Sequence, residues 1–365
     1  MADDEERAMN AGEEEQAMDE QAMEEQERAA TRAGNRRRTV RRVVAIAVVA
    51  ALVWWWWPRP EARPASVRVA AVGAVACASH DPRFADGAGT PATTDPDDLG
   101  GWCRQAEVGA LVTAAAPDAL LGLGDYVYEE PRGADYRNVY DPAFGGLRGD
   151  TWPAIGNQEY KVHEANTFHD YFAGVPDEGW YSYSLGQWHA VVLNSNCDIA
   201  GGCDEGSPQY QWLAADLAAH PDRCVIAYWH HPRWSTGLNG SDDRTDDLWR
   251  LLATEGADVV LTGHEHDYER FEPLDADGLP DPEGVTSFVV GTGGQAVYAP
   301  DEVVGGGDLA GSRRAEAVGS AIRIDDRFGA LFLTLDPDSF SWQFVDITGT
   351  VVDDGTAACS KGQPQ

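Results

Sequence analysis

The sequence predicts an α/β fold, and three observations support this prediction. From Ser66 to Gly263, apolar segments typical of buried strands alternate with segments of helical spacing. Several of these strands end directly before a residue that can bind a metal ion, at the edge where open α/β sheets bind ligands. After Phe271 the predicted strands follow one another with few helices between them. We therefore expect this closing half to pack as a second sheet within the same domain.

Each element is predicted from a local pattern. Strands are expected where apolar residues alternate or run on: Ser66–Ala76, Asp118–Leu123, Trp152–Ile155, a hairpin of Tyr181–Leu185 and His189–Leu193, Cys224–Trp229, the segment that begins at Asp258, Thr286–Val290, Ala321–Ile324, Ala330–Leu335 and Phe340–Val345. Helices are expected where the spacing is helical: Cys103–Ala116, Ser207–His220 and Thr245–Glu255. Ser207 and Pro208 are typical of a cap followed by a first helical turn, which fixes the start of the second helix.

The chain is strongly acidic. Its 365 residues contain 27 Lys and Arg against 61 Asp and Glu, for a formal net charge of −34. Such a surface repels the phosphates of DNA and RNA, so the sequence argues against a nucleic-acid partner bound through a basic patch. The length allows one large domain or two ordinary ones, and nothing in the sequence indicates an oligomeric state.

Three segments precede the predicted domain. Residues 1–42 form an acidic tail that ends in an arginine-rich stretch; we expect it to be solvated, with a short partner-binding helix as the alternative. Residues 43–57 are apolar, with arginines before them and four tryptophans at their end. This pattern favours a single-pass membrane anchor, whereas a cleaved signal peptide is the alternative. Residues 58–66 are a proline-rich linker. The domain at residues 67–359 is then extracytoplasmic at the cell membrane, or secreted if the segment is cleaved.

All six cysteines lie beyond the apolar segment, which favours disulfides in an exported domain. Cys197 and Cys203 flank a short loop with two glycines, and we expect them to pair. Cys77 is expected to pair with Cys103, at the end of the first strand and the start of the first helix. Cys224 and Cys359 then remain to pair with each other. Buried free thiols are the alternative, and the absence of a Cys-x-x-Cys pair disfavours a zinc site.

Potential metal ligands follow the predicted strands in a fixed order. The strand after Asp258 ends in Gly263-His264-Glu265-His266, which brings two imidazoles to one place. Earlier strands end before the other candidates, which are Asp125, Tyr128, Asn157 and His230. Each residue taken singly has an ordinary structural explanation, such as a loop carboxylate, a capping amide or a core histidine. Together, at successive strand ends, they predict a site where two cations bind a phosphate oxygen and activate water.

These motifs resemble the calcineurin-like metallophosphoesterase family, and most closely the secreted bacterial members similar to purple acid phosphatases. Gly124-Asp125-x-x-Tyr128 matches the family pattern GDxxY, Gly156-Asn157 matches the start of GNH[ED], and Gly263-His264-x-His266 matches GHxH. The resemblance extends roughly from Val67 to the end of the chain and includes Gly291–Gly294. It implies a four-layer α/β/β/α sandwich and a centre with two metal ions.

The resemblance also implies a role for each ligand. Asp125 would bridge the two metals, Tyr128 and His266 would bind the first, and Asn157, His230 and His264 would bind the second. A phenolate ligand such as Tyr128 favours Fe(III) at the first position, with Zn, Mn or Fe at the second. Asn157, Gln158 and His231 are the candidate catalytic residues.

Two positions depart from the family pattern. The family places an Asp after the first strand, where this chain has Ala74, so the first metal site lacks a carboxylate. His80 or Asp81, a few residues further on, could substitute for it. The family also has a His after Asn157, where this chain has Gln158, whose amide cannot donate a proton as an imidazolium does.

The sequence therefore predicts a membrane-tethered, extracytoplasmic phosphoesterase that hydrolyses phosphate esters with a metal-bound hydroxide, with activity reduced by the missing carboxylate. A different class of function is also open: a catalytically inactive, surface-displayed domain that binds metal or another ligand. A structural envelope protein that reuses the fold is the third hypothesis. Metal content and turnover distinguish the three, because fold alone does not define activity.

Overall fold

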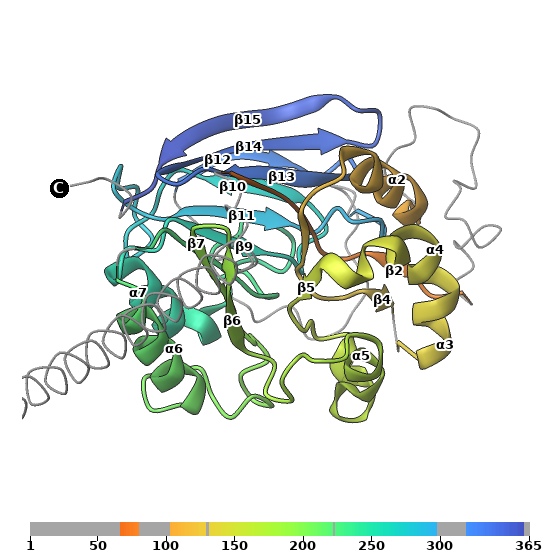
Figure 1. Ribbon diagram of the computed structural model, residues 1–365, viewed down its shortest axis with the longest axis horizontal. Coiled ribbons are helices and arrows are strands. Elements are labelled where there is room, and N and C mark those ends of the chain that lie inside the picture. The colour runs from red at the N-terminus through yellow and green to blue at the C-terminus, as the bar shows by residue number, and fades with distance from the viewer. Residues whose placement is uncertain (1–65, 80–102, 129–130, 222, 298–318, 361–365) are drawn as a thin grey trace, which may run out of the picture. The chain divides into compact units, whose positions relative to one another are not determined.

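The computed structural model describes residues 66–79, 103–128, 131–221, 223–297 and 319–360 (Figure 1). Among these residues, no helix has the length and apolar character needed to cross a membrane. The predicted tail, the apolar segment at residues 43–57 and almost all of the linker lie outside the described residues. The membrane anchor and the domain boundaries accordingly stay predictions.

The first sheet has six strands in the order β15-β14-β13-β1-β3-β5. They are β1 (Val67–Val72), β3 (Ala119–Gly122), β5 (Thr151–Pro153), β13 (Gly329–Leu335), β14 (Ser339–Asp346) and β15 (Val351–Ala358). Strands β1, β3 and β5 are parallel, whereas β13, β14 and β15 continue the sheet antiparallel from β1. The parallel strands therefore end together at one edge of this sheet.

The second sheet has seven strands in the order β12-β10-β11-β9-β8-β7-β6. They are β6 (Tyr181–Leu185), β7 (Trp188–Val192), β8 (Val225–Tyr228), β9 (Val259–Thr262), β10 (Tyr268–Phe271), β11 (Thr286–Val290) and β12 (Ser320–Ile324). Strands β7, β8, β9 and β11 are parallel, and β6 and β7 form the predicted hairpin. Two short strands, β2 (Ala76–Cys77) and β4 (Val127–Tyr128), pair with each other beside the first sheet.

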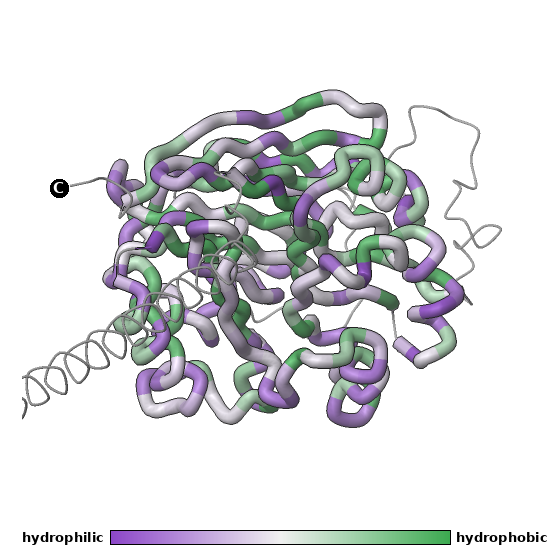
Figure 2. The backbone as a smooth tube through the Cα atoms, viewed as in Figure 1, coloured by the Kyte–Doolittle hydropathy of each residue, from purple (hydrophilic) through white to green (hydrophobic). Residues whose placement is uncertain are grey.

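Three hydrophobic cores separate four layers of structure. The central core joins apolar side chains from both sheets, such as Val69, Leu121, Ile226 and Phe288. A second core lies between the first sheet and the helices α2 (Gln105–Ala115), α3 (Gly133–Asp135), α4 (Asp141–Phe144) and α5 (Asn166–Tyr171), with a π-helix at Tyr136–Tyr140. A third lies between the second sheet and the helices α6 (Pro208–Ala219) and α7 (Asp246–Thr254). The described domain is thus the predicted four-layer sandwich, and Figure 2 shows its hydrophobic residues concentrated along the strands.

The prediction that the closing half forms a second sheet of its own is wrong. Strands β10, β11 and β12 extend the second sheet, whereas β13, β14 and β15 join the first sheet through the pairing of β13 with β1. The physical reason is that each parallel group leaves an open edge, and antiparallel strands added there satisfy its backbone groups. Apolar periodicity identifies a strand but does not say which of two similar edges it will pair with.

The structure confirms all three predicted disulfides, which are Cys77–Cys103, Cys197–Cys203 and Cys224–Cys359. All six cysteines lie within the described residues, and none of them is free. The first bond fixes β2 to the residues before α2, and the third ties the start of β8 to the end of β15. The free-thiol and zinc-cysteine alternatives are therefore excluded.

Candidate metal centre

Three strands end in the same way at the edge where the two sheets meet. A glycine follows each of β1, β3 and β9 and precedes Ala74, Asp125 and His264, whose φ values are 51°, 55° and 67°. A side chain at the glycines would collide with the neighbouring chain, since a Cβ on Gly124 would lie 2.7 Å from Cα of Gly156 and 2.7 Å from Nδ1 of His230. The glycines let the strand ends approach closely. The residues after them have a left-handed backbone conformation, which turns the chain at that point.

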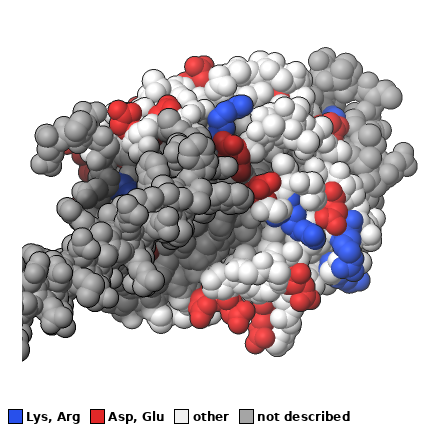
Figure 3. Space-filling view, viewed as in Figure 1, with Lys and Arg blue, Asp and Glu red and all other residues white. Residues whose placement is uncertain are grey.

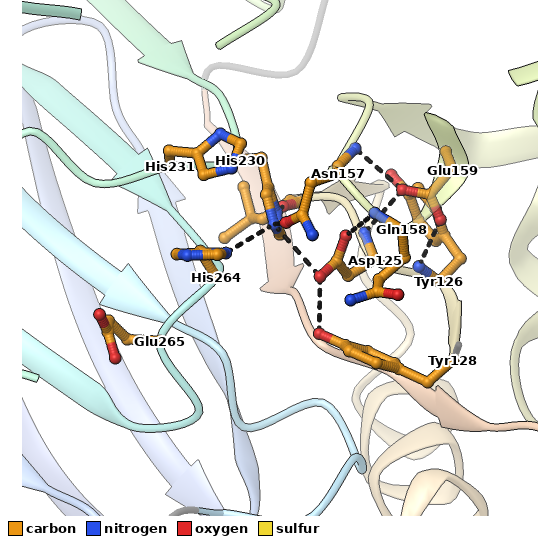
Figure 4. Close-up of polar contacts among 12 residues, drawn as sticks. Asp125, Tyr126, Tyr128, Asn157, Gln158, Glu159, His230, His231, His264 and Glu265 are labelled. Atoms are coloured by element: carbon orange, nitrogen blue, oxygen red, sulfur yellow. Dashed lines mark hydrogen bonds and ion pairs between the residues drawn. The ribbon is translucent and has the colours of Figure 1, made fainter. Parts of the chain in front are cut away.

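Asp125 is the central residue of the site (Figure 4). Its side chain is buried, with 2% exposed. Oδ2 accepts a hydrogen bond from the hydroxyl of Tyr128 at 2.7 Å and lies 3.3 Å from Nε2 of His230. Oδ1 accepts from the backbone N–H of Gln158 at 2.9 Å. Asp125 therefore connects the tyrosine side of the site to the histidine side, which is the position that a bridging ligand needs.

The histidine side brings lone pairs together around one atom. Nδ1 of His230 donates to the carbonyl of Leu123 at 2.7 Å, so in the neutral ring Nε2 carries a lone pair. That Nε2 lies 2.9 Å from Oδ1 of Asn157, 3.2 Å from Nδ1 of His264 and 3.3 Å from Oδ2 of Asp125. Carboxylate, amide oxygen and imidazole are suitable donors for a divalent cation. The donor set fits a metal at this position.

The pKa shifts show that this group of atoms attracts positive charge. Burial lowers the pKa of His230, but the charge of Asp125 and the hydrogen bonds to Asp125 and Leu123 raise it, and the net pKa lies above the ordinary value. Burial and the neighbouring His230 lower the pKa of His264 to about 3, which keeps this imidazole neutral. Burial raises the pKa of Asp125, whereas His230, His264 and the N–H of Gln158 together lower it to below its ordinary value and keep the carboxylate ionised. A single positive charge among these groups is favoured, from a proton or from a cation.

The tyrosine side offers a second set of donors. The hydroxyl of Tyr128 lies 3.0 Å from Nε2 of His266, whose Nδ1 donates to the carbonyl of Ala296 at 2.6 Å. With Asp125 this gives a phenol, an imidazole and a carboxylate, which fit a cation less completely than the histidine side. Ala74 lies just beyond the adjacent strand β1 and is fully buried, with its N–H bonded to the carbonyl of Gly124 at 3.3 Å. The possible substitutes, His80 and Asp81, lie outside the described residues.

The structure brings together all of the predicted site residues, which are Asp125, Tyr128, Asn157, Gln158, His230, His231, His264 and His266. Gln158 joins the site through its backbone, and its Oε1 is buried without a hydrogen-bond partner among the described residues. A buried, unpartnered amide oxygen requires a donor, which a water or a substrate hydroxyl could supply. The side chain of Gln158 is therefore placed to meet a ligand.

His231 lies closer to the metal ligands than its sequence position alone indicates. One nitrogen of its ring and one each from His230 and His264 lie within 4.8 Å of one another. Ser195 accepts from the backbone N–H of His231 at 2.9 Å, while its hydroxyl lies 2.8 Å from Nδ1 of the same ring. Since the hydroxyl proton is free to point to Nδ1, the tautomer of His231 with hydrogen on Nε2 is favoured.

Two buried residues of the site were not predicted from the sequence. Glu159 accepts from the backbone N–H groups of Asp125, Tyr126 and Gly156, each at 2.9 Å, and thereby fixes the two loops that carry ligands. Burial and the charge of Asp125 raise the pKa of Glu159 to about 7. Ser195 is the other residue, and it lies in a buried loop with no periodic pattern. For Glu159 the acidic last position of the GNH[ED] pattern could have indicated a role.

Comparisons with known proteins find similarity to phosphoesterases. The family model for calcineurin-like phosphoesterases matches residues 98–268. Purple acid phosphatase 22 of Arabidopsis thaliana is 26% identical over 246 residues, which cover 60% of this chain and 54% of the relative. Purple acid phosphatase 18 of the same plant is 35% identical over 123 residues, which cover 32% of this chain and 26% of the relative.

Solved structures show the same fold. A purple acid phosphatase from yellow lupin (Lupinus luteus) seeds has a TM-score of 0.59 at 19% identity, covering 80% of this chain and 54% of the other. GAP50, the anchor in the inner membrane complex of Plasmodium, has a TM-score of 0.56 at 13% identity, and the match covers 80% of this chain and 89% of the other. These two similarities show the fold alone.

The fold and the site define a two-sheet α/β domain with ligands for metal ions at its strand ends. Residues 98–268 match the calcineurin-like phosphoesterase family model, and the curated relatives and the fold support the same family. The similarity to purple acid phosphatases implies a centre with two metal ions. The chain spans at most about half the length of these curated relatives, with 26% and 54% covered. Membership of the secreted bacterial branch stays a prediction.

Proposed function

We propose that this protein is a metal-dependent phosphoesterase that hydrolyses phosphate esters at the site around Asp125. One observation carries the proposal: Oδ1 of Asn157, Nδ1 of His264 and Oδ2 of Asp125 all lie within 3.3 Å of Nε2 of His230. Such crowding of electron-pair donors is unfavourable unless a positive charge lies among them. A structural cluster of histidines would instead be expected to satisfy its nitrogens with protein donors and acceptors.

Two cations would be held by different faces of this set. Asn157, His230 and His264 would hold one, Tyr128 and His266 the other, and Asp125 would lie between them. Cations bound there would polarise a phosphoryl oxygen and lower the pKa of water. A phenolate at Tyr128 favours Fe(III) on its side, with Zn, Mn or Fe on the histidine side.

The chain's own residues orient the substrate. Glu159 fixes the backbones of Asp125 and Gly156, so the ligand-bearing loops keep their geometry without a bound phosphate. His231, held by Ser195, presents an Nε2–H that can donate to the ester oxygen that leaves. We propose that His231 supplies the imidazole that Gln158 does not.

We further propose that the domain acts outside the cytoplasm, tethered by residues 43–57 or released after cleavage. Three disulfides support an oxidising compartment, because such bonds are rare in reducing ones. Fractionation of cells that produce the full chain would test this location, with protease added to intact cells. If the protease digests the domain only after the cells are lysed, the domain lies inside the cell and the proposed location is wrong.

A catalytically inactive metal-binding domain is the second candidate, and Ala74 favours it because that side chain gives the first metal no ligand. The two candidates differ in metal content and turnover. We expect the purified full chain to contain two metal ions at the centre and to release phosphate from an aryl phosphate ester. One ion without turnover would instead support the binding domain, and no ion would contradict both.

A further inference from the structure

A second cluster of metal-binding side chains lies on the outer face of the second sheet, where α6 covers β7. His189 is near the start of β7, Asp216 lies in the last turn of α6, and His220 caps the end of that helix. One potential ligand atom from each of the three residues lies within 4.8 Å of the other two. The candidate metal centre lies at the opposite, carboxyl end of the same parallel strands. The cluster is thus separate from that centre.

Asp216 is held in place by its neighbours. Its Oδ2 lies 2.5 Å from Nε2 of His189, and its Oδ1 accepts from the hydroxyl of Ser182 at 2.8 Å. The hydroxyl of Ser182 orients the carboxylate in the way that outer residues orient metal ligands in known sites. His189 is 2% exposed and Asp216 12%, so both side chains have little freedom to move. One imidazole and one carboxylate are therefore already aligned.

His220 is the adjustable member of the cluster. Its side chain is 36% exposed, and it follows the last residue of α6. Nδ1 lies 2.8 Å from the carbonyl of Asp216 and 3.9 Å from its Oδ1. The ring stacks on His189 with centroids 3.9 Å apart and an angle of 20° between the ring planes, so the two rings lie face to face. The ring of His220 must turn before both imidazoles can bind one ion, and its exposure permits this.

We propose that His189, Asp216 and His220 form a metal site that takes Zn²⁺, with water as the remaining ligand. Two imidazoles and one carboxylate, with an open fourth position, are a common zinc ligand set. The surroundings also suit a cation, because Arg223, near the start of the next strand, donates to Ser184 on β6. A zinc ion there would link α6 to β7 and stabilise the layer between them. This proposal stands independently of the phosphoesterase activity.

The test uses the full chain with His264→Ala, which weakens the candidate metal centre and isolates the new site. We would remove metal with a chelator, add Zn²⁺ alone, and measure both bound zinc and melting temperature. His220→Ala and Asp216→Asn in this background should each lose about one bound Zn²⁺ and the zinc-dependent rise in melting temperature. His163→Ala is the matched control, because that side chain is 80% exposed and lies 3.5 Å from Glu164, which is itself 78% exposed.

Folding defects do not obscure the result. Asp216→Asn removes a buried partner of His189 and can lower stability by itself. His220→Ala changes only a partly exposed side chain at a helix end, so in chelator the His220→Ala variant should have the melting temperature of its parent. Equal zinc content and equal zinc-dependent stabilisation in the His220→Ala variant and the His163→Ala control would overturn the proposal. The cluster would then be a hydrogen-bonded group that binds no metal.

Discussion

Ala74 occupies a position whose backbone is already suited to a ligand. It follows a glycine at the end of β1 with φ 51°, and the corresponding residues after β3 and β9 are Asp125 and His264. Asp adopts the left-handed region more readily than Ala does, so a carboxylate can be introduced here without added backbone strain. The parallel pairing of β1 with β3 places this residue beside Asp125. The sequence-based alignment of Ala74 with the family's first Asp agrees with this geometry.

We predict that Ala74→Asp tightens metal binding on the tyrosine side by about tenfold or more and raises turnover, because a charged ligand completes that donor set. Metal titration and the rate of phosphate release would measure both effects, and Fe(III) bound by Tyr128 should also give a visible charge-transfer colour. Ala74→Asn is the control, since Asn fits the same backbone but adds no charge. Unchanged affinity and rate would show that another residue already fills the position.

Ser195 is predicted to position His231 rather than to bind metal. Ser195→Ala should leave the metal content unchanged and lower kcat by about 10- to 100-fold, because His231 loses the contact that fixes its tautomer. The pH profile of kcat should change as well, which a purely structural role would not cause. Ser184→Ala, on the exposed part of β6, is the control. A Ser195→Ala enzyme with wild-type kcat would remove His231 from the mechanism.

At the scale of elements, a buried carboxylate joins the two sheets. Asp353 of β15 accepts from Nε of Arg270 at 2.8 Å and from the hydroxyl of Tyr268 at 2.6 Å, both on β10. The indole of Trp342 on β14 also donates to it, at 3.1 Å. Burial raises the pKa of Asp353, but the hydrogen bonds from Arg270, Tyr268 and Trp342 and the charge of Arg270 together lower it, and the net pKa lies below its ordinary value. This contact connects β15 to the opposite sheet.

Asp353→Asn should lower the free energy of unfolding at pH 7 by about 1–3 kcal/mol, because hydrogen bonds to a charged group are weakened. A carboxyl whose pKa is lower in the folded state stabilises the fold above the unfolded pKa, and this contribution is lost as pH falls through the folded value. The difference between wild type and variant should therefore shrink below about pH 4. Urea denaturation at several pH values measures it, and a difference that persists in acid would contradict the role.

Sequence reasoning predicted elements better than it predicted their partners. Ser207 caps α6 as expected, since its hydroxyl accepts from the N–H of Tyr210. Strand β15 was not predicted, because its sequence VVDDGTAA lacks an apolar pattern and its pairing with β14 decides its conformation. The ligand order was predictable because each ligand follows an apolar strand. Glu159 and Ser195 were not, since a buried polar residue in a loop has no local signal.

At the scale of the whole molecule, disulfides close loops of very different length. Cys224 and Cys359 are 135 residues apart, whereas Cys197 and Cys203 are 6 apart. Closing a longer loop removes more entropy from the unfolded chain, which gives about 5 kcal/mol for the first bond and about 2 kcal/mol for the second.

Replacing Cys224 and Cys359 by alanine should therefore lower the denaturant midpoint more than replacing Cys197 and Cys203. Urea denaturation of the two double variants measures this order directly. A larger loss from the short loop would show that local strain or residual structure, and not loop length, decides the contribution of each bond.

The charge of the molecule favours cationic ligands. Figure 3 shows acidic side chains in several groups on the visible face of the described residues, with Lys and Arg at fewer positions. With a formal net charge of −34, the chain raises the local concentration of cations and repels phosphate esters. Bound metal would offset this repulsion at the candidate centre. We therefore expect substrate affinity to depend on metal loading.

The central claim is that Asp125 and His264 hold metal that catalyses phosphate-ester hydrolysis, and metal content measured together with rate tests it most directly. Asp125→Asn and His264→Ala in the full chain should each lose at least one metal ion and about a thousandfold or more in rate, since cations supply several kcal/mol of charge stabilisation. Asp118→Asn is the control, because Asp118 lies before β3 whereas Asp125 lies after it. This variant should keep its metal content and its rate. Full metal content and full rate in both site variants would contradict the account.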